Sequence, residues 1–317
     1  MSLLTPSTTF KPFQYGWAME FATDHEKIHW GEWELNLQDD VNDWKMGKVT
    51  DAEKHHVTQI LRLFTQSDVA VADNYCELFI PSFKNNEIRN MLLSFANREG
   101  THQRAYALLN DTLGFDDSEY QAFLGYKQMV KKIEFMTDSD TSTLSGLGKA
   151  LARSAINEGM SLFSAFTMLL NYQRFGKFKG MCEVVEWSIR DETMHVEGMT
   201  RLFRTFCAEH PRIINDEFKK DIYAMVRQAV KLEDKVIELA YKMGDIEGLT
   251  AHEVKQYIRY IADRRLIQLG LKPNFKVKEN PIPWLDWIVS GDSFKNFFEG
   301  VVTDYSKSGL SGDDWGW

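Results

Sequence analysis

Two copies of one short pattern carry the strongest chemical signal in this chain of 317 residues. Glu99-Gly-Thr-His102 and Glu192-Thr-Met-His195 each place a carboxylate and an imidazole three residues apart. On a helix, residues three apart share one face, so each pattern offers an oxygen and a nitrogen ligand to the same point. A single Glu-x-x-His is common on helix surfaces, but two of them on separate helices favour a dinuclear metal site in a helical bundle.

Such a site needs two further carboxylates, and two acidic residues stand in otherwise apolar segments. Asp68 interrupts the apolar stripe of residues 57–71, and Glu158 lies among the apolar residues of 155–166. A buried carboxylate needs a cation or a proton, although Asp68 taken alone could be an ordinary paired polar residue. Four carboxylates balance the charge of two divalent ions, and mixed oxygen and nitrogen donors suit iron or manganese better than a soft metal. The predicted ligands are Asp68, Glu99, His102, Glu158, Glu192 and His195.

The remaining six histidines have no comparable partners in the sequence. We expect them to be exposed or to have a structural role: His25, His29, His55, His56, His210 and His252.

Long helices must position these ligands, and the proline distribution favours them. The chain has 7 prolines, and none of them lies between Pro81 and Pro211. Apolar residues recur at helical spacing, with a cap region expected at Thr50 and Asp51. The pattern predicts an all-α fold with helices over residues 51–79, 86–113, 118–136, 144–172, 178–208, 215–243 and 251–271.

The composition excludes several classes of protein. The net charge of −9 argues against a nucleic-acid partner. No segment approaches the roughly 20 apolar residues of a membrane span, and residues 1–16 lack the features of a signal peptide. The three cysteines are scattered and do not form Cys-x-x-Cys pairs, which is typical of reduced thiols. We therefore expect a cytoplasmic protein with no membrane contact.

The last part of the chain differs from the rest. Asn280-Pro-Ile-Pro-Trp284 breaks helical periodicity, and residues 306–317 are rich in Gly, Ser and Asp. No linker is long enough to divide the chain before that point. We expect one domain with an N-terminal arm over residues 1–305, followed by a flexible tail over 306–317.

In order and spacing, the six predicted ligands resemble those of class I ribonucleotide reductase small subunits, which are ferritin-like helical bundles. Tyr106 follows His102 by four residues, where that family keeps its radical tyrosine. One helical turn beyond a ligand places a phenol beside the metals. Without the resemblance, a tyrosine packed in the core would explain Tyr106 equally well.

More distant residues extend the resemblance from about Trp30 to Tyr305. Trp30, rather than Trp33, matches the family's electron-relay tryptophan, and Asp191 matches the aspartate that links it to a metal-bound histidine. Glu299 and Tyr305 match the glutamate and tyrosine near the C-terminal end. One departure is Ser188, which stands where many members have an apolar residue near the tyrosine; this bears on how dry the radical pocket is. The final Asp-Asp-Trp-Gly-Trp matches no tail of the family.

The resemblance implies a mechanism and its partners. Two iron ions, two manganese ions or a mixed pair react with an oxygen species and oxidise Tyr106. The oxidising equivalent then passes to a large subunit, which reduces ribonucleoside diphosphates or triphosphates. The resemblance further implies a homodimer, docking of the large subunit through the tail, and a flavodoxin-like activase if the metal is manganese. A dinuclear-metal oxidase or hydroxylase, and a ferritin-like metal store, are the alternatives.

Overall fold

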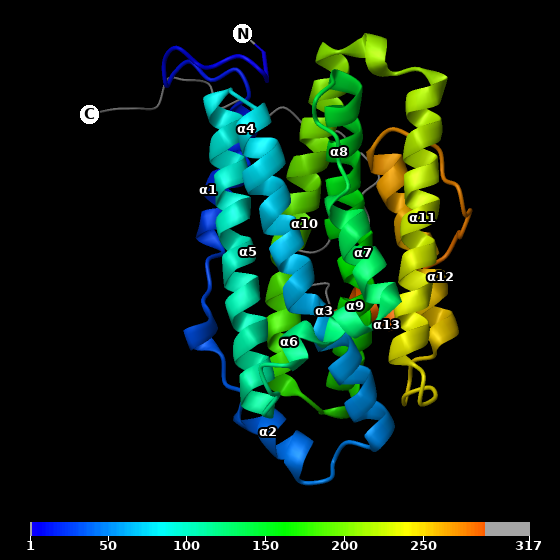
Figure 1. The fold of residues 1–317 in the computed structure, drawn as a ribbon. Helices are drawn as coiled ribbons and strands as arrows, with labels where there is room; N and C mark the ends of the chain where they lie inside the picture. The colour runs from blue at the N-terminus through cyan, green and yellow to red at the C-terminus, as the bar shows by residue number, and fades with distance from the viewer. Residues whose placement is uncertain (1, 289–317) are drawn as a thin grey trace.

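The computed structural model describes residues 2–288 of the chain, and they form a helical bundle (Figure 1). Within this range there is no β-strand, and the one isolated bridge joins Ile246 to Leu249. The expected all-α fold is therefore confirmed. The helices are α1 (Gly16–Lys27), α2 (Gln38–Lys45), α3 (Asp51–Asp73), α4 (Ile80–Ser82), α5 (Asn86–Leu113), α6 (Glu119–Ala122), α7 (Lys127–Thr137), α8 (Leu144–Ile156), α9 (Leu162–Leu170), α10 (Lys179–Glu209), α11 (Asp216–Ala240), α12 (Ala251–Gln268) and α13 (Pro283–Ile288).

The long helices begin at side chains that satisfy their first free N–H groups. Thr50 accepts a hydrogen bond from the Glu53 N–H, and the Glu53 carboxylate accepts one from the Thr50 N–H. This reciprocal capping box starts α3, as the sequence predicted. Side chains also cap the N-termini of α5, α8, α11 and α12, and the capping residues are Asn85, Thr143, Asn215 and Thr250.

The bundle brings together helices that are far apart in the sequence. Figure 1 shows α3 beside α5, α8 beside α10, and α11 beside α12, with their long axes running in similar directions. One large apolar cluster extends through these helices and forms the core. The short helix α1 packs along α5 and also contacts α10. Apolar side chains from these helices thus make up most of the interior of the bundle.

Three of the predicted helices are interrupted, and the one expected over 51–79 passes into π-helical spacing at Asn74–Phe79. The helix expected over 118–136 breaks at Gly125 and Tyr126, where Arg62 of α3 binds the Tyr126 hydroxyl at 2.9 Å and the Glu119 carboxylate. The helix expected over 144–172 runs through a widened turn, Asn157–Ser161, in which the hydrogen bonds have π-helical spacing. We call this segment the π-turn. It is the segment that carries Glu158.

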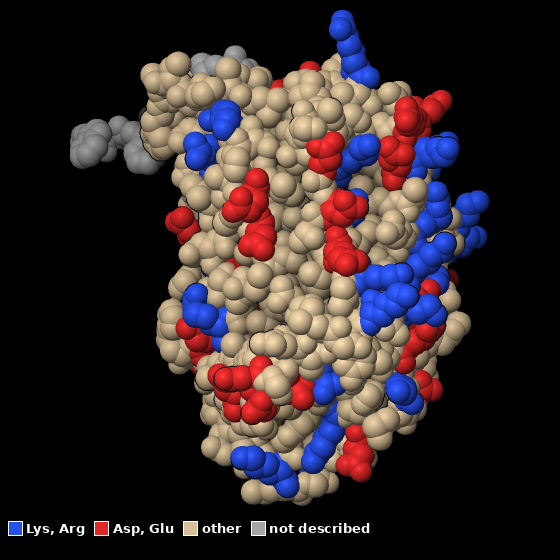
Figure 2. All heavy atoms as spheres, viewed as in Figure 1, with Lys and Arg blue, Asp and Glu red and all other residues tan. Residues whose placement is uncertain are grey.

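The surface carries charge of both signs. On the face shown in Figure 2, basic side chains gather along the edge formed by α11, and acidic side chains are prominent on the neighbouring helices. The basic residues of α11 are Lys219, Lys220, Arg227, Lys231 and Lys235. No helix among residues 2–288 is long and apolar enough to cross a membrane. Glu299, Tyr305 and the expected tail over 306–317 lie outside the described residues.

Candidate metal centre

Four neighbouring segments place all six predicted ligands inside the bundle. Asp68 comes from α3 and Glu158 from the π-turn, while α5 and α10 each contribute one Glu-x-x-His pair. None of the six side chains is more than 1% exposed. The arrangement follows from the helical period, because residues three apart on α5 and on α10 point toward the same neighbouring helices.

The ligand atoms form two overlapping groups that share Glu99. One group contains Glu99, Glu158, Glu192 and His195, and the other contains Asp68, Glu99 and His102. Within each group, one ligand atom per residue lies within 4.8 Å of the others. If two ions were bound, the Glu99 carboxylate would be within reach of both.

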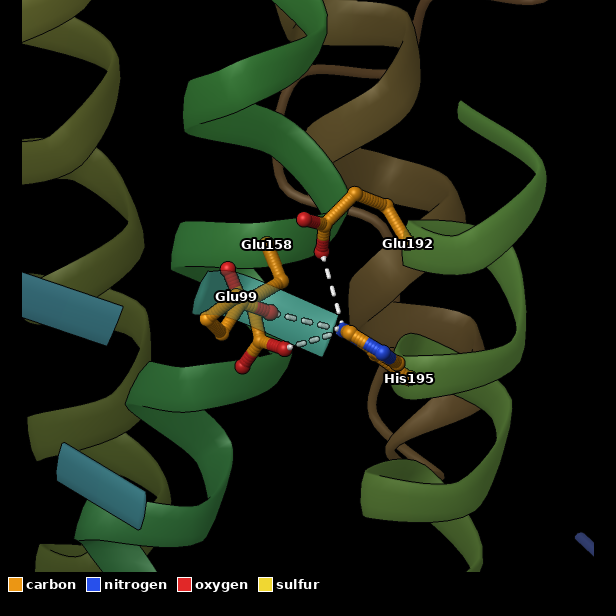
Figure 3. Close-up of side chains that lie close together, drawn as sticks. All are labelled: Glu99, Glu158, Glu192 and His195. Carbon is orange, nitrogen blue, oxygen red and sulfur yellow. Dashed lines mark ion pairs between the residues drawn. The ribbon is translucent and has the colours of Figure 1, made fainter. Parts of the chain in front are cut away.

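Three carboxylates of the first group lie close to one ring nitrogen of His195, as the dashed lines in Figure 3 show. Its Nδ1 atom is 3.0 Å from Glu99 Oε1, 3.4 Å from Glu158 Oε2 and 3.4 Å from Glu192 Oε2. His102 Nδ1 lies 3.3 Å from Glu192 Oε1 and 3.6 Å from Glu99 Oε2. Both histidines therefore turn the same ring nitrogen toward the carboxylates.

The polar atoms of this cluster are not paired as an ordinary hydrogen-bond network would pair them. Asp68 Oδ2, both oxygens of Glu99 and Glu192, and His195 Nδ1 are buried without a partner in hydrogen-bond geometry. Burying unpaired carboxylate oxygens is costly unless a cation binds them. The donor set, four carboxylates with two imidazoles, fits two divalent ions of the iron or manganese type.

The pKa values of the cluster show the same need for positive charge. Burial raises the pKa of Asp68 well above its usual range and also raises the pKa of Glu158. Burial opposes charge on the two histidines, but their contacts with the surrounding carboxylates outweigh it and raise the pKa of both His102 and His195. Without cations, the cluster holds protons that two metal ions would replace.

A chain of hydrogen bonds leads away from His102. Its Nε2 atom lies 3.1 Å from Asp191 Oδ2, and the same oxygen accepts a 2.7 Å hydrogen bond from Trp30 Nε1. Arg98 also donates to this carboxylate, at 3.2 Å. The structure thus brings Trp30, Asp191 and His102 together. Trp30 is 2% exposed, whereas Trp33 is 67% exposed and takes no part in this chain.

Tyr106 lies one helical turn beyond His102 and is fully buried. Its hydroxyl is 3.1 Å from Ser188 Oγ. Its ring packs edge-on against that of Phe64, with 4.3 Å between the ring centroids. Burial, followed by the charge of Asp68, raises the pKa of Tyr106 well above its usual range. The phenol therefore keeps its proton at any ordinary pH. Ser188 thus supplies a polar contact beside the buried phenol.

Three contacts around the ligands were not predicted from the sequence. Tyr75 donates a 2.6 Å hydrogen bond to Glu158 Oε2, and Ser154 donates to the other oxygen of the same carboxylate. His25 of α1 lies 3.1 Å from His195, between their Nε2 atoms, and is 1% exposed. Burial, followed by the charge of His195, lowers the pKa of His25 to about 2. Tyr75 follows Asp68 by seven residues, a helical spacing that could have indicated it, but no sequence pattern links His25 to His195.

Comparisons with known proteins point to one family. The family model for the ribonucleotide reductase small chain matches residues 7–281. A probable ribonucleoside-diphosphate reductase small subunit of Invertebrate iridescent virus 3 is 41% identical, and the match covers 100% of this chain and 89% of the relative.

Solved structures share the fold at lower identity. A ribonucleotide reductase R2 subunit from Clostridium botulinum superposes with a TM-score of 0.83 at 20% identity, covering 91% of this chain and 94% of that one. A dimanganese(II) protein from Streptococcus sanguinis gives 0.74 at 20% identity, over 86% and 94% of the two chains. From the family match and the viral relative it follows that this chain belongs to the ribonucleotide reductase small chain family.

Proposed function

We propose that this chain holds two metal ions at the six clustered residues and uses them to oxidise Tyr106. The observation that carries the proposal is the sharing of Glu99 between two buried groups of ligand atoms. The two ions, when bound, supply the oxidising power by reacting with an oxygen species. They are two iron ions, two manganese ions or one of each, because the donor set accepts all three pairs.

The protein's own residues would orient the metal ligands and keep water away from Tyr106. Two oxygens on Glu158 are held by Tyr75 and Ser154, which orient the carboxylate. The core around the cluster is apolar and keeps solvent away from an oxidised Tyr106. Because the phenol keeps its proton until it is oxidised, Tyr106 must lose an electron and a proton together, and Ser188 Oγ is the hydroxyl partner of its oxygen.

The route by which the oxidising equivalent leaves is proposed from the hydrogen-bond chain. His102 and Asp191 connect the ligand cluster to the buried indole of Trp30. We propose that Tyr305 passes the equivalent onward to the large subunit, with Glu299 close to it in the sequence. Both residues lie outside the described range, so their roles rest on the family resemblance alone.

The proposed partner is the large subunit of a ribonucleotide reductase, which binds residues 306–317 and reduces ribonucleotides. A homodimer is the proposed assembly, since a protein from Saccharomyces cerevisiae with the same fold has been solved as a homodimer. If the ions are manganese, a flavodoxin-like activase is a further proposed partner.

The test combines metal analysis with an activity assay. The wild-type chain, mixed with the large subunit, should form deoxyribonucleotides and bind two ions per chain. His195→Ala should keep its helices but lose affinity mainly for one ion. Tyr305→Phe should keep both ions yet form no deoxyribonucleotides, because phenylalanine cannot be oxidised at a comparable potential. Normal nucleotide reduction by Tyr305→Phe would disprove the proposed exit route, and unchanged metal affinity in His195→Ala would disprove the ligand assignment.

A further inference from the structure

The two histidines of the cluster are supported by different kinds of partner. His102 turns Nε2 toward the Asp191 carboxylate, at 3.1 Å, whereas His195 turns Nε2 toward another imidazole, that of His25. We propose that His25 is a positioning residue that holds His195 in its metal-binding tautomer and makes the two metal positions unequal in affinity. This inference rests on the dinuclear site proposed above.

The tautomers follow from which atoms face each other. The Nδ1 atom of His195 faces three carboxylates, so a bound ion takes its lone pair there and the ring proton must lie on Nε2. The His195 Nε2–H then donates to His25 Nε2. His25 accepts at that atom only if its own proton lies on Nδ1, and Nδ1 is 2.9 Å from Ser94 Oγ. One arrangement of protons satisfies all three side chains.

Helix α5 holds His25 firmly enough to act in this way. Ser94 receives its Nδ1–H, the Phe95 ring packs edge-on against it at 5.2 Å, and Arg98 donates to its backbone carbonyl at 3.3 Å. These three residues lie on two successive turns of α5, directly before Glu99. Ser94 also lines an open pocket of about 370 Å³ between α1 and α5, while His25 itself is buried.

The difference between the partners makes the two ligands unequal. A hydrogen bond to a carboxylate is charge-assisted and about twice as strong as one between neutral groups. Donation to Asp191 therefore makes His102 a stronger metal ligand than donation to His25 makes His195. The ion bound by Glu99, Glu158, Glu192 and His195 should be the more weakly held of the two, and its binding should depend on His25.

Titration with manganese(II) under anaerobic conditions tests the inference without any turnover. The signal of free manganese(II) in electron paramagnetic resonance gives the affinity of each of the two positions. His25→Leu removes the acceptor and should weaken one position by about 10- to 100-fold while leaving the other unchanged. His25→Gln supplies an amide oxygen as acceptor and should recover most of the loss.

A matched control separates positioning from general loss of packing. His56 is a fully buried histidine of the same core, bonded to the Tyr172 hydroxyl at 3.0 Å. It lies twelve residues before Asp68 on α3, about 18 Å along the helix. His56→Leu should lower the melting temperature and leave both metal affinities unchanged.

The manganese affinities of the wild type and the two His25 variants can each contradict a different part of the inference. Two unchanged affinities in His25→Leu, or an equal loss at both positions, would overturn the role of His25 and leave the dinuclear site intact. A loss in His25→Gln as large as that in His25→Leu would overturn the hydrogen-bond argument. A wild-type chain that binds fewer than two ions would overturn both this inference and the proposed function.

Discussion

At the scale of single residues, Asp191 contacts three residues in or beside the ligand cluster through one carboxylate. Its carboxylate accepts from Trp30 and Arg98 and lies within hydrogen-bond distance of His102 Nε2. Burial opposes its charge, but the contacts with His102 and Arg98 outweigh burial and lower the pKa of Asp191 to about 2. The carboxylate therefore stays ionised at neutral pH and remains an acceptor for both rings.

The first prediction concerns the tryptophan of this chain. Trp30→Phe removes the indole N–H from Asp191, which keeps its other two partners, so the variant should still bind two ions. The lost hydrogen bond to a buried carboxylate should cost about 1–3 kcal/mol of stability. Nucleotide reduction with the large subunit should fall to background. Trp33→Phe is the matched control, because Trp33 is 67% exposed and should tolerate the change. Equal activities in the two variants would refute a relay through Trp30.

The metal ligands could be predicted from the sequence, but the residues that form hydrogen bonds around them could not. Glu99 and His102 were recognisable because a three-residue spacing on one helix brings them together without tertiary information. His25 could not be predicted, since it reaches His195 only when α1 packs along α5 and α10. Arg98 lies next to a predicted ligand, yet only the fold shows that it points toward Asp191.

At the scale of secondary-structure elements, the π-turn Asn157–Ser161 is the feature that most affects the site. Its widened hydrogen-bonding leaves carbonyl groups that need other donors. Arg265 of α12 donates to the Gly159 carbonyl at 2.8 Å, and Lys132 of α7 donates to the Ser161 carbonyl at 3.0 Å. Two buried cations from neighbouring helices thus hold the segment that presents Glu158.

The second prediction tests this support. A Cβ atom at position 159 would lie 2.4 Å from Arg265 Nε, so Gly159→Ala must displace the guanidinium or the turn. We expect a loss of about 1–3 kcal/mol in stability and weaker binding of the ion that Glu158 holds. Gly125→Ala is the control, because no heavy atom lies within 4 Å of the added Cβ there. Metal affinity equal to wild type in Gly159→Ala would show that the turn does not depend on this close approach.

The helices themselves were largely predictable, and two of the interruptions depend on contacts from other helices. Residues 86–113 were predicted as a helix, and α5 spans Asn86–Leu113, because apolar periodicity is a local signal. The π-turn has no local signal, since it depends on donors supplied by α7 and α12. The break at Tyr126 likewise depends on Arg62 of another helix. Interruptions imposed by tertiary contacts are invisible to helical periodicity.

At the scale of the whole molecule, the buried charges link metal binding to stability and pH. The pKa values of Asp68, Glu158, His102 and His195 are all raised in the metal-free fold. A group whose pKa is raised by folding contributes stability below its ordinary pKa and loses it as pH rises through the raised value. For the histidines this loss begins above about pH 6.5, their ordinary value.

The third prediction follows from the direction of this change in stability with pH. The metal-free chain should lose stability as pH rises above about 6.5, whereas metal ions bind better as their ligands lose protons. The gap in melting temperature between manganese-loaded and metal-free protein should therefore widen as pH rises above that value. Thermal melting followed by circular dichroism measures the gap, with a chelator-treated sample as the reference. A gap that narrows with rising pH would contradict the proposed protonation of the cluster.

The central claim is that the bundle exists to oxidise Tyr106 with two bound metal ions. The most direct test is the electron paramagnetic resonance spectrum of the chain after loading with iron(II) or manganese(II) and exposure to oxidant. Wild type should show the signal of an organic radical, and Tyr106→Phe should bind two ions and show none. An organic radical of equal intensity in Tyr106→Phe, or its absence from fully loaded and oxidised wild type, would contradict the account.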